Sequence, residues 1–192
     1  ENGIVSLSSL EFDRGIALWQ GDITRLAADA VVNAANSALL GCFIPHHKCI
    51  DNVIHSRAGA QLRLDCSRIM GMQGEPEPAG CAKITLGYNL PAKYVIHTVG
   101  PMVGVKPTET DARTLRNCYV SCLNLAREMN LKSIAFCCIS TGVFGYPNDE
   151  AAEIAVGAVR NWLLETGCDI KVVFDVFLDK DRAIYADILK NL

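Results

Sequence analysis

The chain has 192 residues, half of them apolar, and a formal net charge of −3. A domain of this length removes roughly 70% of its unfolded surface from water, so one large core is expected. The weak negative charge leaves no basic field for a polyphosphate backbone, which argues against a nucleic-acid partner. It favours a small phosphate ligand held by backbone amides and helix N-termini.

No apolar run reaches the roughly 18 residues that span a bilayer, and residues 1–10 lack the basic start of a signal peptide. The nine cysteines are an odd number and are scattered through apolar stretches, unlike the disulfide framework of a secreted protein. These features predict a cytoplasmic monomer without a membrane partner, whose reduced thiols include metal ligands.

Short runs of β-branched and aliphatic residues, each bounded by turn residues, are predicted to be strands. In chain order they cover residues 16–20, 30–33, 82–88, 94–98, 133–140 and 171–178. Several are apolar throughout, as strands covered on both faces are.

The segments between these runs have the spacing of amphipathic helices. Between residues 98 and 133, apolar side chains recur at three- and four-residue steps along one face. They are Leu115, Cys118, Tyr119, Cys122, Leu123 and Ala126. Another helix is predicted to open with Asn148 as a cap, to carry Asp149 and Glu150 in its first turn, and to close at Gly167.

The inner stripe of that helix is predicted to be Ile154, Ala155, Ala158, Val159 and Trp162. A last helix is predicted from about Asp179, with Ala183, Ile184 and Ile188 buried. Strands that alternate with helices predict an α/β fold with helices on both faces of the sheet and ligands at the C-terminal strand ends. Because the chain shows no repeat and no long linker, we expect a single domain over residues 1–192, with 1–15 as an N-terminal extension.

Polar or glycine-rich segments follow three of the predicted strands and are expected to converge on one cleft. After the first strand comes Gln20-Gly21-Asp22-Ile23-Thr24, where the Asp22 carboxylate can accept a hydrogen bond from an exocyclic amine such as that of adenine. The alternative is a plain turn in which Asp22 or Thr24 caps a neighbouring segment. After the second strand, Asn33 and Asn36 can present amides to sugar hydroxyls.

The third segment, Ser140-Thr141-Gly142-Val143-Phe144-Gly145-Tyr146, lies between a buried strand and a helix N-terminus. Two glycines permit positive φ, so successive amides can turn inward and form an anion-binding nest for a diphosphate. Phe144 or Tyr146 is then placed to wall a ribose. The alternative is a purely structural loop.

Residues 41–49 concentrate two thiols and two imidazoles. Cys42, His47 and Cys49 supply three ligands suited to Zn²⁺, and spacing alone also allows His46 in place of His47. Three protein ligands are typical of a catalytic zinc that keeps one position open, whereas a structural zinc has four. A distant Cys66 or Cys81 would complete such a closed site.

A helix is predicted directly after this loop, with Ile50, Val53, Ile54 and Ala58 on one face. Asp51 then lies in its first turn, either as a favourable charge at the helix N-terminus or as the group that orients or deprotonates an attacking water. His55 and His97 fall in apolar surroundings and are predicted to be core histidines.

Together these segments resemble the macrodomain family from Ile16 to Leu189. The resemblance rests on Gln20-Gly21-Asp22-Ile23-Thr24, Val32-Asn33-Ala34-Ala35-Asn36, Ile54-His55, Ala58-Gly59 and Ser140-Thr141-Gly142-Val143-Phe144-Gly145. It implies a three-layer α/β/α sandwich with a mixed central sheet and ADP-ribose in a cleft. Adenine would lie near Asp22 and Ile23, the diphosphate against residues 140–145, and the distal ribose by Asn33 and Asn36.

The Gly-Cys-Phe-Ile-Pro loop, the His47-Lys48-Cys49 step and the continuation Ile50-Asp51-Asn52 resemble the zinc-dependent subclass of that family. This resemblance favours His47 over His46 as a ligand. It implies hydrolysis of mono-ADP-ribose from protein side chains, with Asn36 holding the ribose and Asp51 positioning or activating the nucleophile. The alternatives are a reader of ADP-ribosylated proteins with a structural zinc, and a deacetylase of O-acetyl-ADP-ribose.

Overall fold

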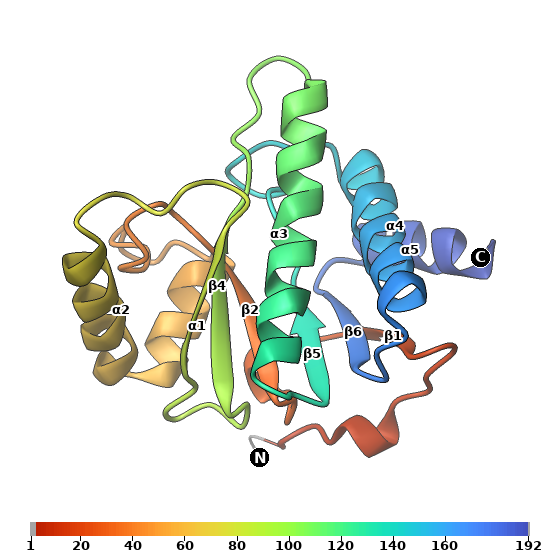
Figure 1. Cartoon of the computed structure of the whole chain (residues 1–192), viewed down its shortest axis with the longest axis horizontal. Coiled ribbons are helices and arrows are strands. Elements are labelled where there is room, and N and C mark those ends of the chain that lie inside the picture. Colours follow the sequence, from red (N-terminus) through yellow and green to blue (C-terminus); the bar gives the residue numbers. More distant parts are fainter. Residues whose placement is uncertain (1–2, 192) are drawn as a thin grey trace.

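Figure 1 shows a computed structural model of the chain, which describes residues 3–191, so residues 1, 2 and 192 of the predicted domain lie outside the described part. Within the described residues, six strands form one sheet in the order β1-β6-β5-β2-β4-β3. The strands are β1 (Ile16–Gln20), β2 (Ala30–Ala35), β3 (Ala82–Leu86), β4 (Tyr94–Val99), β5 (Ser133–Phe136) and β6 (Lys171–Val176). Neighbours run parallel except β3, which is antiparallel to β4. The sheet is therefore mixed, as expected.

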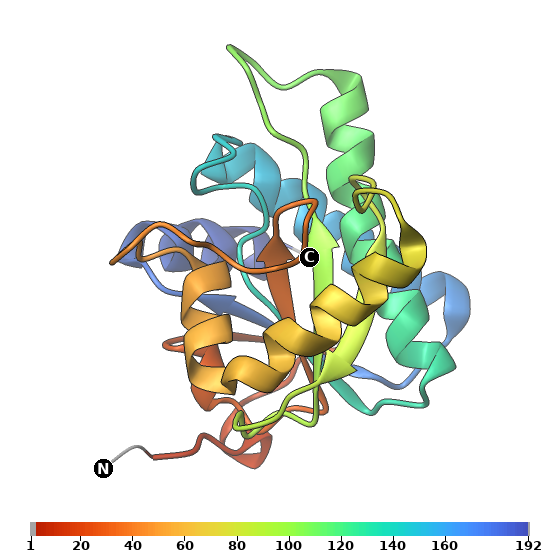
Figure 2. The ribbon, with the colours of Figure 1, turned by 90° about the vertical axis from the view of Figure 1, so that its left-hand side faces the viewer.

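Helices cover both faces of this sheet. They are α1 (Ile50–Ala58), α2 (Ala60–Gln73), α3 (Glu109–Glu128), α4 (Asn148–Thr166) and α5 (Asp179–Lys190), with the short 3-10 helices η1 (Leu7–Ser9) and η2 (Ile23–Arg25). Figure 2 shows α1 on one side of the strands and α3 on the other. The α/β/α sandwich is confirmed. No helix within residues 3–191 is both long and apolar enough to cross a membrane.

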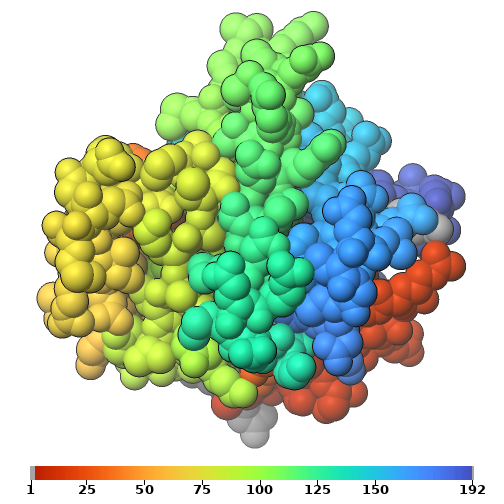
Figure 3. All heavy atoms as spheres, viewed as in Figure 1, coloured from red at the N-terminus to blue at the C-terminus, as the bar shows by residue number. Residues whose placement is uncertain are grey.

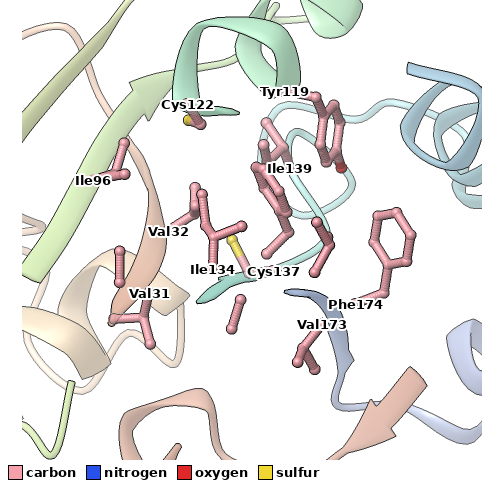
Figure 4. Close-up of a cluster of buried hydrophobic side chains, with 14 of the residues drawn as sticks. Val31, Val32, Ile96, Tyr119, Cys122, Ile134, Cys137, Ile139, Val173 and Phe174 are labelled. Carbon is pink, nitrogen blue, oxygen red and sulfur yellow. The ribbon is translucent and has the colours of Figure 1, made fainter. Parts of the chain in front are cut away.

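One large core joins the sheet to the helices. An aromatic chain crosses it from α3 to α5, with ring centroids 4.9 Å apart for Tyr119–Phe136, 6.4 Å for Phe136–Phe174 and 5.1 Å for Phe174–Tyr185. Figure 4 shows this apolar packing around Ile134 of β5 and Cys137, which follows the end of that strand. The predicted inner face of α3 is confirmed, since all six of its apolar residues are buried. In Figure 3, α3 and α4 lie in front of the central part of the sheet.

Three predicted strands extended too far. β3 ends at Leu86, β5 at Phe136 and β6 at Val176, because the ladder pairing stops there although the sequence remains apolar. Residues 137–140 instead begin the loop that leads to α4, so Cys137 is buried beyond the strand rather than on it. β2 and β4 run on to residues 35 and 99, where they continue to pair with each other.

The helices also differ from the predictions in detail. The sequence reading missed α2, in which only Leu62 and Cys66 are buried and no clear apolar stripe appears. In α4, Pro147 rather than Asn148 is the cap residue, and the Asn148 side chain donates to Asp181 at 2.6 Å instead. In α5, the prediction of a buried Ala183 is wrong: Asp181 and Tyr185 are the buried residues.

Candidate active site

The predicted site residues gather at the carboxyl ends of the parallel strands, as expected for an α/β sheet. In Figure 2 the loops after β2 and β4 lie at the top, above the strand arrowheads, and the loop that leads to α4 lies beside them. The structure brings the loop between β2 and α1 (residues 36–49) next to Asp51, the acid in the first turn of α1. This loop and α1 form one end of the candidate site.

Asp51 accepts hydrogen bonds from two asparagines, Asn33 within β2 and Asn36 directly after it. Asn33 donates to Asp51 Oδ1 at 2.8 Å, and Asn36 donates to Oδ2 at 3.4 Å. His55, one turn along α1, places Nε2 3.5 Å from Oδ1. Asp51 is only 5% exposed, and burial raises the pKa of its carboxyl above the usual range, while the Asn33 hydrogen bond acts in the opposite sense. The carboxylate is thus fixed in position and partly shielded from water.

Asn33 and Asn36 lie at different depths and make different contacts. Asn33 is fully buried, and its Nδ2 also lies 3.2 Å from His97 Nδ1, so its amide supports Asp51 from below. Asn36 is half-buried at the surface of the site, and it donates at 3.2 Å to the carbonyl of Gly41 in the loop between β2 and α1. Asn36 therefore connects the two parts of the site.

Cys42, His47 and Cys49 converge on one point. Their ligand atoms all lie within 4.8 Å of one another, and Cys42 Sγ is 3.3 Å from His47 Nδ1. All three side chains are half-buried. His46 is exposed with a φ of 58° and lies outside this group, which contains His47.

Within the described residues, this group contains no fourth His, Cys, Asp or Glu ligand atom. Of the two distant cysteines that would close the site, Cys66 is buried in a different group and Cys81 is exposed. The donor set is therefore two thiols and one imidazole, the chemistry that suits Zn²⁺ with a position left open.

The loop is shaped so that its last ligand also starts a helix. Cys49 is the N-cap of α1, and its sulfur accepts a hydrogen bond from the backbone N–H of Asn52 at 3.4 Å. Burial raises the pKa of the Cys49 thiol, and this N–H acts in the opposite sense. At the other end of the loop, Gly41 has a φ of +83°, and a Cβ there would meet the His55 ring at 2.9 Å. Only glycine fits that position.

A second group of donors, His55, Cys66 and His97, also lies within 4.8 Å, but it is fully buried behind Asp51. His97 Nδ1 faces the Asn33 amide and Nε2 faces the Thr85 hydroxyl at 3.0 Å, so both ring nitrogens are already engaged. Burial lowers the pKa of His55 to about 4 and that of His97 to about 3. The prediction that both are core histidines is confirmed.

Residues 140–146 form a tight loop between β5 and α4. The N–H groups of Gly145 and Tyr146 close turns onto the carbonyls of Gly142 and Ser140, at 3.0 and 2.9 Å. Within residues 3–191, the N–H groups of residues 141–144 donate no hydrogen bond, so they are available to an anion. Positive φ occurs at Gly145 (72°) and at Ser140 (66°), not at both glycines as predicted.

The side chains of this loop point in different directions. Val143 is exposed, Phe144 is half-buried, and the Phe144 carbonyl accepts from Val103 at 2.8 Å, which joins the loop to the one after β4. Thr141 donates to the Cys138 carbonyl at 3.2 Å. Tyr146 is only 2% exposed, so Phe144 alone remains as the aromatic wall that was expected.

Asp22 forms the capped turn that was the alternative to an adenine contact. Its carboxylate accepts from the N–H and the hydroxyl of Thr24, at 3.0 and 2.6 Å, and caps η2. Ile23 is only 1% exposed and belongs to the core. The side chain of Asp22 is half-buried at the strand end and still faces solvent in part.

A match to known proteins agrees with this geometry. A model of the Macro domain family matches residues 32–155. A protein-ADP-ribose hydrolase from Staphylococcus aureus (strain MRSA252) is 58% identical over 173 residues, which cover 90% of this chain and 65% of that protein. A protein-ADP-ribose hydrolase from Treponema medium is 53% identical over 190 residues, covering 96% of this chain and 73% of that protein.

A solved structure, the Trypanosoma brucei macrodomain in complex with ADP-ribose, has a TM-score of 0.85 at 36% identity and covers 98% of this chain and 78% of that one. The chain belongs to the macrodomain family. This macrodomain spans only 65% of the length of the S. aureus protein that it matches.

The sequence did not single out Phe177 as a candidate site residue of the macrodomain. Phe177 follows β6 and is 73% exposed, and its carbonyl accepts from the Gln20 side chain at 3.2 Å. Since Gln20 pairs with Val176 in neighbouring parallel strands, Phe177 and Asp22 emerge at the same sheet edge. The available signal was an aromatic residue just beyond a buried strand, which the overlong strand prediction had absorbed.

A cavity of about 1070 Å³ lies elsewhere, between the N-terminal segment and the ends of α4 and α5. It is lined by Ser9 to Leu18, Arg160 and Gly167 to Ile170, among others, and by none of the predicted site residues. Figure 3 shows the N-terminal segment (red) beside the last turns of α4 (blue). A smaller cavity of about 420 Å³ reaches His55 from the side of α2.

Proposed function

We propose that this macrodomain is a hydrolase that removes mono-ADP-ribose from modified protein side chains, with Zn²⁺ bound by Cys42, His47 and Cys49. The observation that carries the proposal is the position of these three ligand atoms, within 4.8 Å of one another and directly before the helix that holds Asp51. The names of the S. aureus and Treponema medium relatives support hydrolysis of protein-linked ADP-ribose.

The donor set fits the metal on chemical grounds. Thiolate and imidazole are the ligands that Zn²⁺ prefers, and Cys49 lies at a helix N-terminus, where the positive end of the dipole favours its thiolate. When bound, Zn²⁺ would act as a Lewis acid, polarising an oxygen next to the bond that breaks and lowering the pKa of nearby water.

The rest of the cleft would hold the nucleotide. Phe177 offers a flat apolar face to the adenine ring, and the Asp22 carboxylate beside it offers an acceptor to the adenine amine. The N–H groups of residues 141–144 would bind the diphosphate, with Ser140 and Gly145 setting the curve of the loop. These contacts lie far from the bond that breaks and supply binding energy that positions it.

The distal ribose would then lie over Asn36 and Asp51. Asp51 Oδ1 already faces Asn33 and His55, whereas Oδ2 has only the longer 3.4 Å contact with Asn36. We therefore assign to Oδ2 the task of accepting the proton of the attacking water. Asn36 would orient the ribose and, through Gly41, keep the metal loop in register with it.

The decisive test is release of free ADP-ribose from a mono-ADP-ribosylated protein by wild type, Cys49→Ser and Asp51→Ala. Turnover is expected to need zinc, to be lost on chelation and in both variants, and to return to the wild type when zinc is restored. Cys81→Ser, which removes an exposed cysteine outside the group, is the matched control and should retain activity.

Binding of ADP-ribose, measured by calorimetry, separates the remaining readings. Binding without release by the zinc-loaded wild type would make the chain a reader of ADP-ribosylation. Full turnover after complete removal of zinc would refute the role of the metal, and a much faster rate on O-acetyl-ADP-ribose than on modified protein would reassign the substrate.

A further inference from the structure

The metal loop depends on Asn52, a residue in the first turn of α1 that carries no assigned role so far. Its backbone N–H donates to Cys49 Sγ at 3.4 Å, and its side-chain Nδ2 donates to the carbonyl of His47 at 2.8 Å. One residue thus binds both the sulfur of one candidate ligand and the main chain of another.

These contacts differ from those that hold the rest of the loop. His47 N–H bonds to the Ile44 carbonyl at 3.2 Å inside the loop, and Asn36 reaches only Gly41 at its start. The Asn52 side chain links the ligand-bearing end of the loop, residues 47–49, to the rigid helix that follows.

We propose that Asn52 is a positioning residue for the metal, which fixes His47 and Cys49 relative to each other before the ion binds. This inference rests on the proposed zinc site, and Asn52 itself is assigned no contact with substrate. In metal sites, hydrogen bonds from residues behind the ligands orient those ligands and raise affinity for the ion. Without the side chain, the loop must be ordered when the metal binds, at a cost in entropy.

The amide is suited to this task for a geometric reason. Asn52 is three residues after the N-cap, so its N–H points back toward the cap sulfur, as in ordinary helix capping. Its side chain is just long enough to reach back to residue 47, which places a donor against a carbonyl oxygen. Alanine lacks the donor, and leucine keeps the volume but also lacks it.

The experiment compares Asn52→Ala and Asn52→Leu with the wild type and with Ser56→Ala, a change at an exposed position on the same helix. Zinc dissociation constants are measured by competition with a chromophoric chelator. Both Asn52 variants are expected to bind zinc about 10-fold more weakly or worse. The Ser56 variant should match the wild type, and ADP-ribose affinity of the metal-free proteins should be the same for all four.

Two further readouts separate positioning from folding. The rise in melting temperature on adding zinc should shrink in both Asn52 variants, while their melting temperatures in chelator stay near that of the wild type. In the Co²⁺-loaded proteins, the thiolate charge-transfer and d–d bands should change in shape, which reports an altered ligand geometry.

The outcomes divide cleanly. Zinc affinity within twofold of the wild type in both variants would overturn the role of Asn52 while leaving the metal site intact. Equal loss of melting temperature with and without zinc would assign Asn52 to the fold and overturn it as well. A wild type that binds no zinc at all would remove the metal from the proposed function, and the role of Asn52 with it.

Discussion

Two groups of three metal-type donors lie close to Asp51, one with two cysteines and a histidine and the other with two histidines and a cysteine, and they differ in burial. Cys42, His47 and Cys49 are half-buried on a loop, whereas His55, Cys66 and His97 are buried between helices and sheet. In the buried group, His97 is engaged at both ring nitrogens, and burial raises the pKa of the Cys66 thiol to about 12.

The difference shows that donor type and proximity do not by themselves define a metal site. A ligand must be able to lose its proton and offer a lone pair, and the group needs a route to solvent. The loop group has a route to solvent because it is partly exposed, and the helix N–H on Cys49 opposes the rise in pKa that burial causes there. In the buried group, His97 holds Asn33, which in turn donates to the carboxylate of Asp51.

The strongest test of this contrast removes one thiol from each group. Cys49→Ser is expected to weaken zinc binding by more than about 100-fold, since even residues behind a ligand contribute 10–100-fold. Cys66→Ser is expected to leave zinc stoichiometry at one ion per chain and zinc affinity unchanged. Metal content after dialysis against limiting zinc measures both, and loss of the ion from the Cys66 variant would exchange the roles of the two groups.

The second test compares stability, for which the buried group should matter more than the loop group. His97→Ala leaves Asn33 and Thr85 without their partner and opens a cavity, so the free energy of unfolding should fall by about 2–4 kcal/mol. His47→Ala should change it by less than about 0.5 kcal/mol in chelator, as surface-loop changes do. Urea unfolding of the metal-free proteins gives both values. Equal losses would show that the loop is part of the cooperative core.

A third test uses pH. The pKa of His97 is lowered by burial to about 3 in the folded protein. The unfolded chain, with an ordinary histidine pKa of about 6.5, therefore binds more protons between these values. Stability should be fully present above pH 6.5 and fall as the pH drops, by up to about 1.4 kcal/mol per pH unit from this residue.

His97→Gln removes that proton site while it keeps a polar side chain of similar size. Its free energy of unfolding, measured in urea from pH 7 to pH 4.5, should therefore decline less steeply than that of the wild type. If the free energy of unfolding of the variant fell with pH as steeply as that of the wild type, His97 would be taking up its proton in the folded protein as readily as in the unfolded chain.

The sequence predicted the core better than the contacts of the site. The six apolar positions of α3 follow the helical period and are all buried, because periodicity is a local property. The hydrogen bond from Asn33 to Asp51 joins residues 18 apart in the chain, and no spacing rule reveals it. The convergence of Cys42, His47 and Cys49 was predictable because all three lie within eight residues.

The misses have physical causes of the same kind. α2 buries only Leu62 and Cys66, so its period is too weak to be read from the sequence. Phe177 was counted as strand because the apolar run continues past Val176, where pairing with β1 ends. The positive φ of Ser140 is imposed by the loop around it and could not be anticipated from a serine.

The smallest expected effect concerns a contact between α2 and the loop that carries Cys42, His47 and Cys49. The Arg63 guanidinium lies 4.5 Å from the centroid of the Phe43 ring, which joins α2 to the residue after Cys42. At exposed sites such a cation–π contact contributes about 0.5–1 kcal/mol. If the loop is the metal site, Arg63→Ala and Phe43→Ala should each weaken zinc binding by roughly two- to fivefold, and the double variant no more than either alone.

Lys171 and Phe12 form a matched pair at the other end of the molecule, with the ammonium 4.8 Å from the ring centroid. Lys171→Ala should lower stability by a similar amount and leave zinc affinity untouched, because it does not contact the loop. Chelator competition on the single and double variants measures the coupling. Additive losses for Arg63 and Phe43 would mean that the two side chains act on the loop separately, and that the contact between them does not hold it.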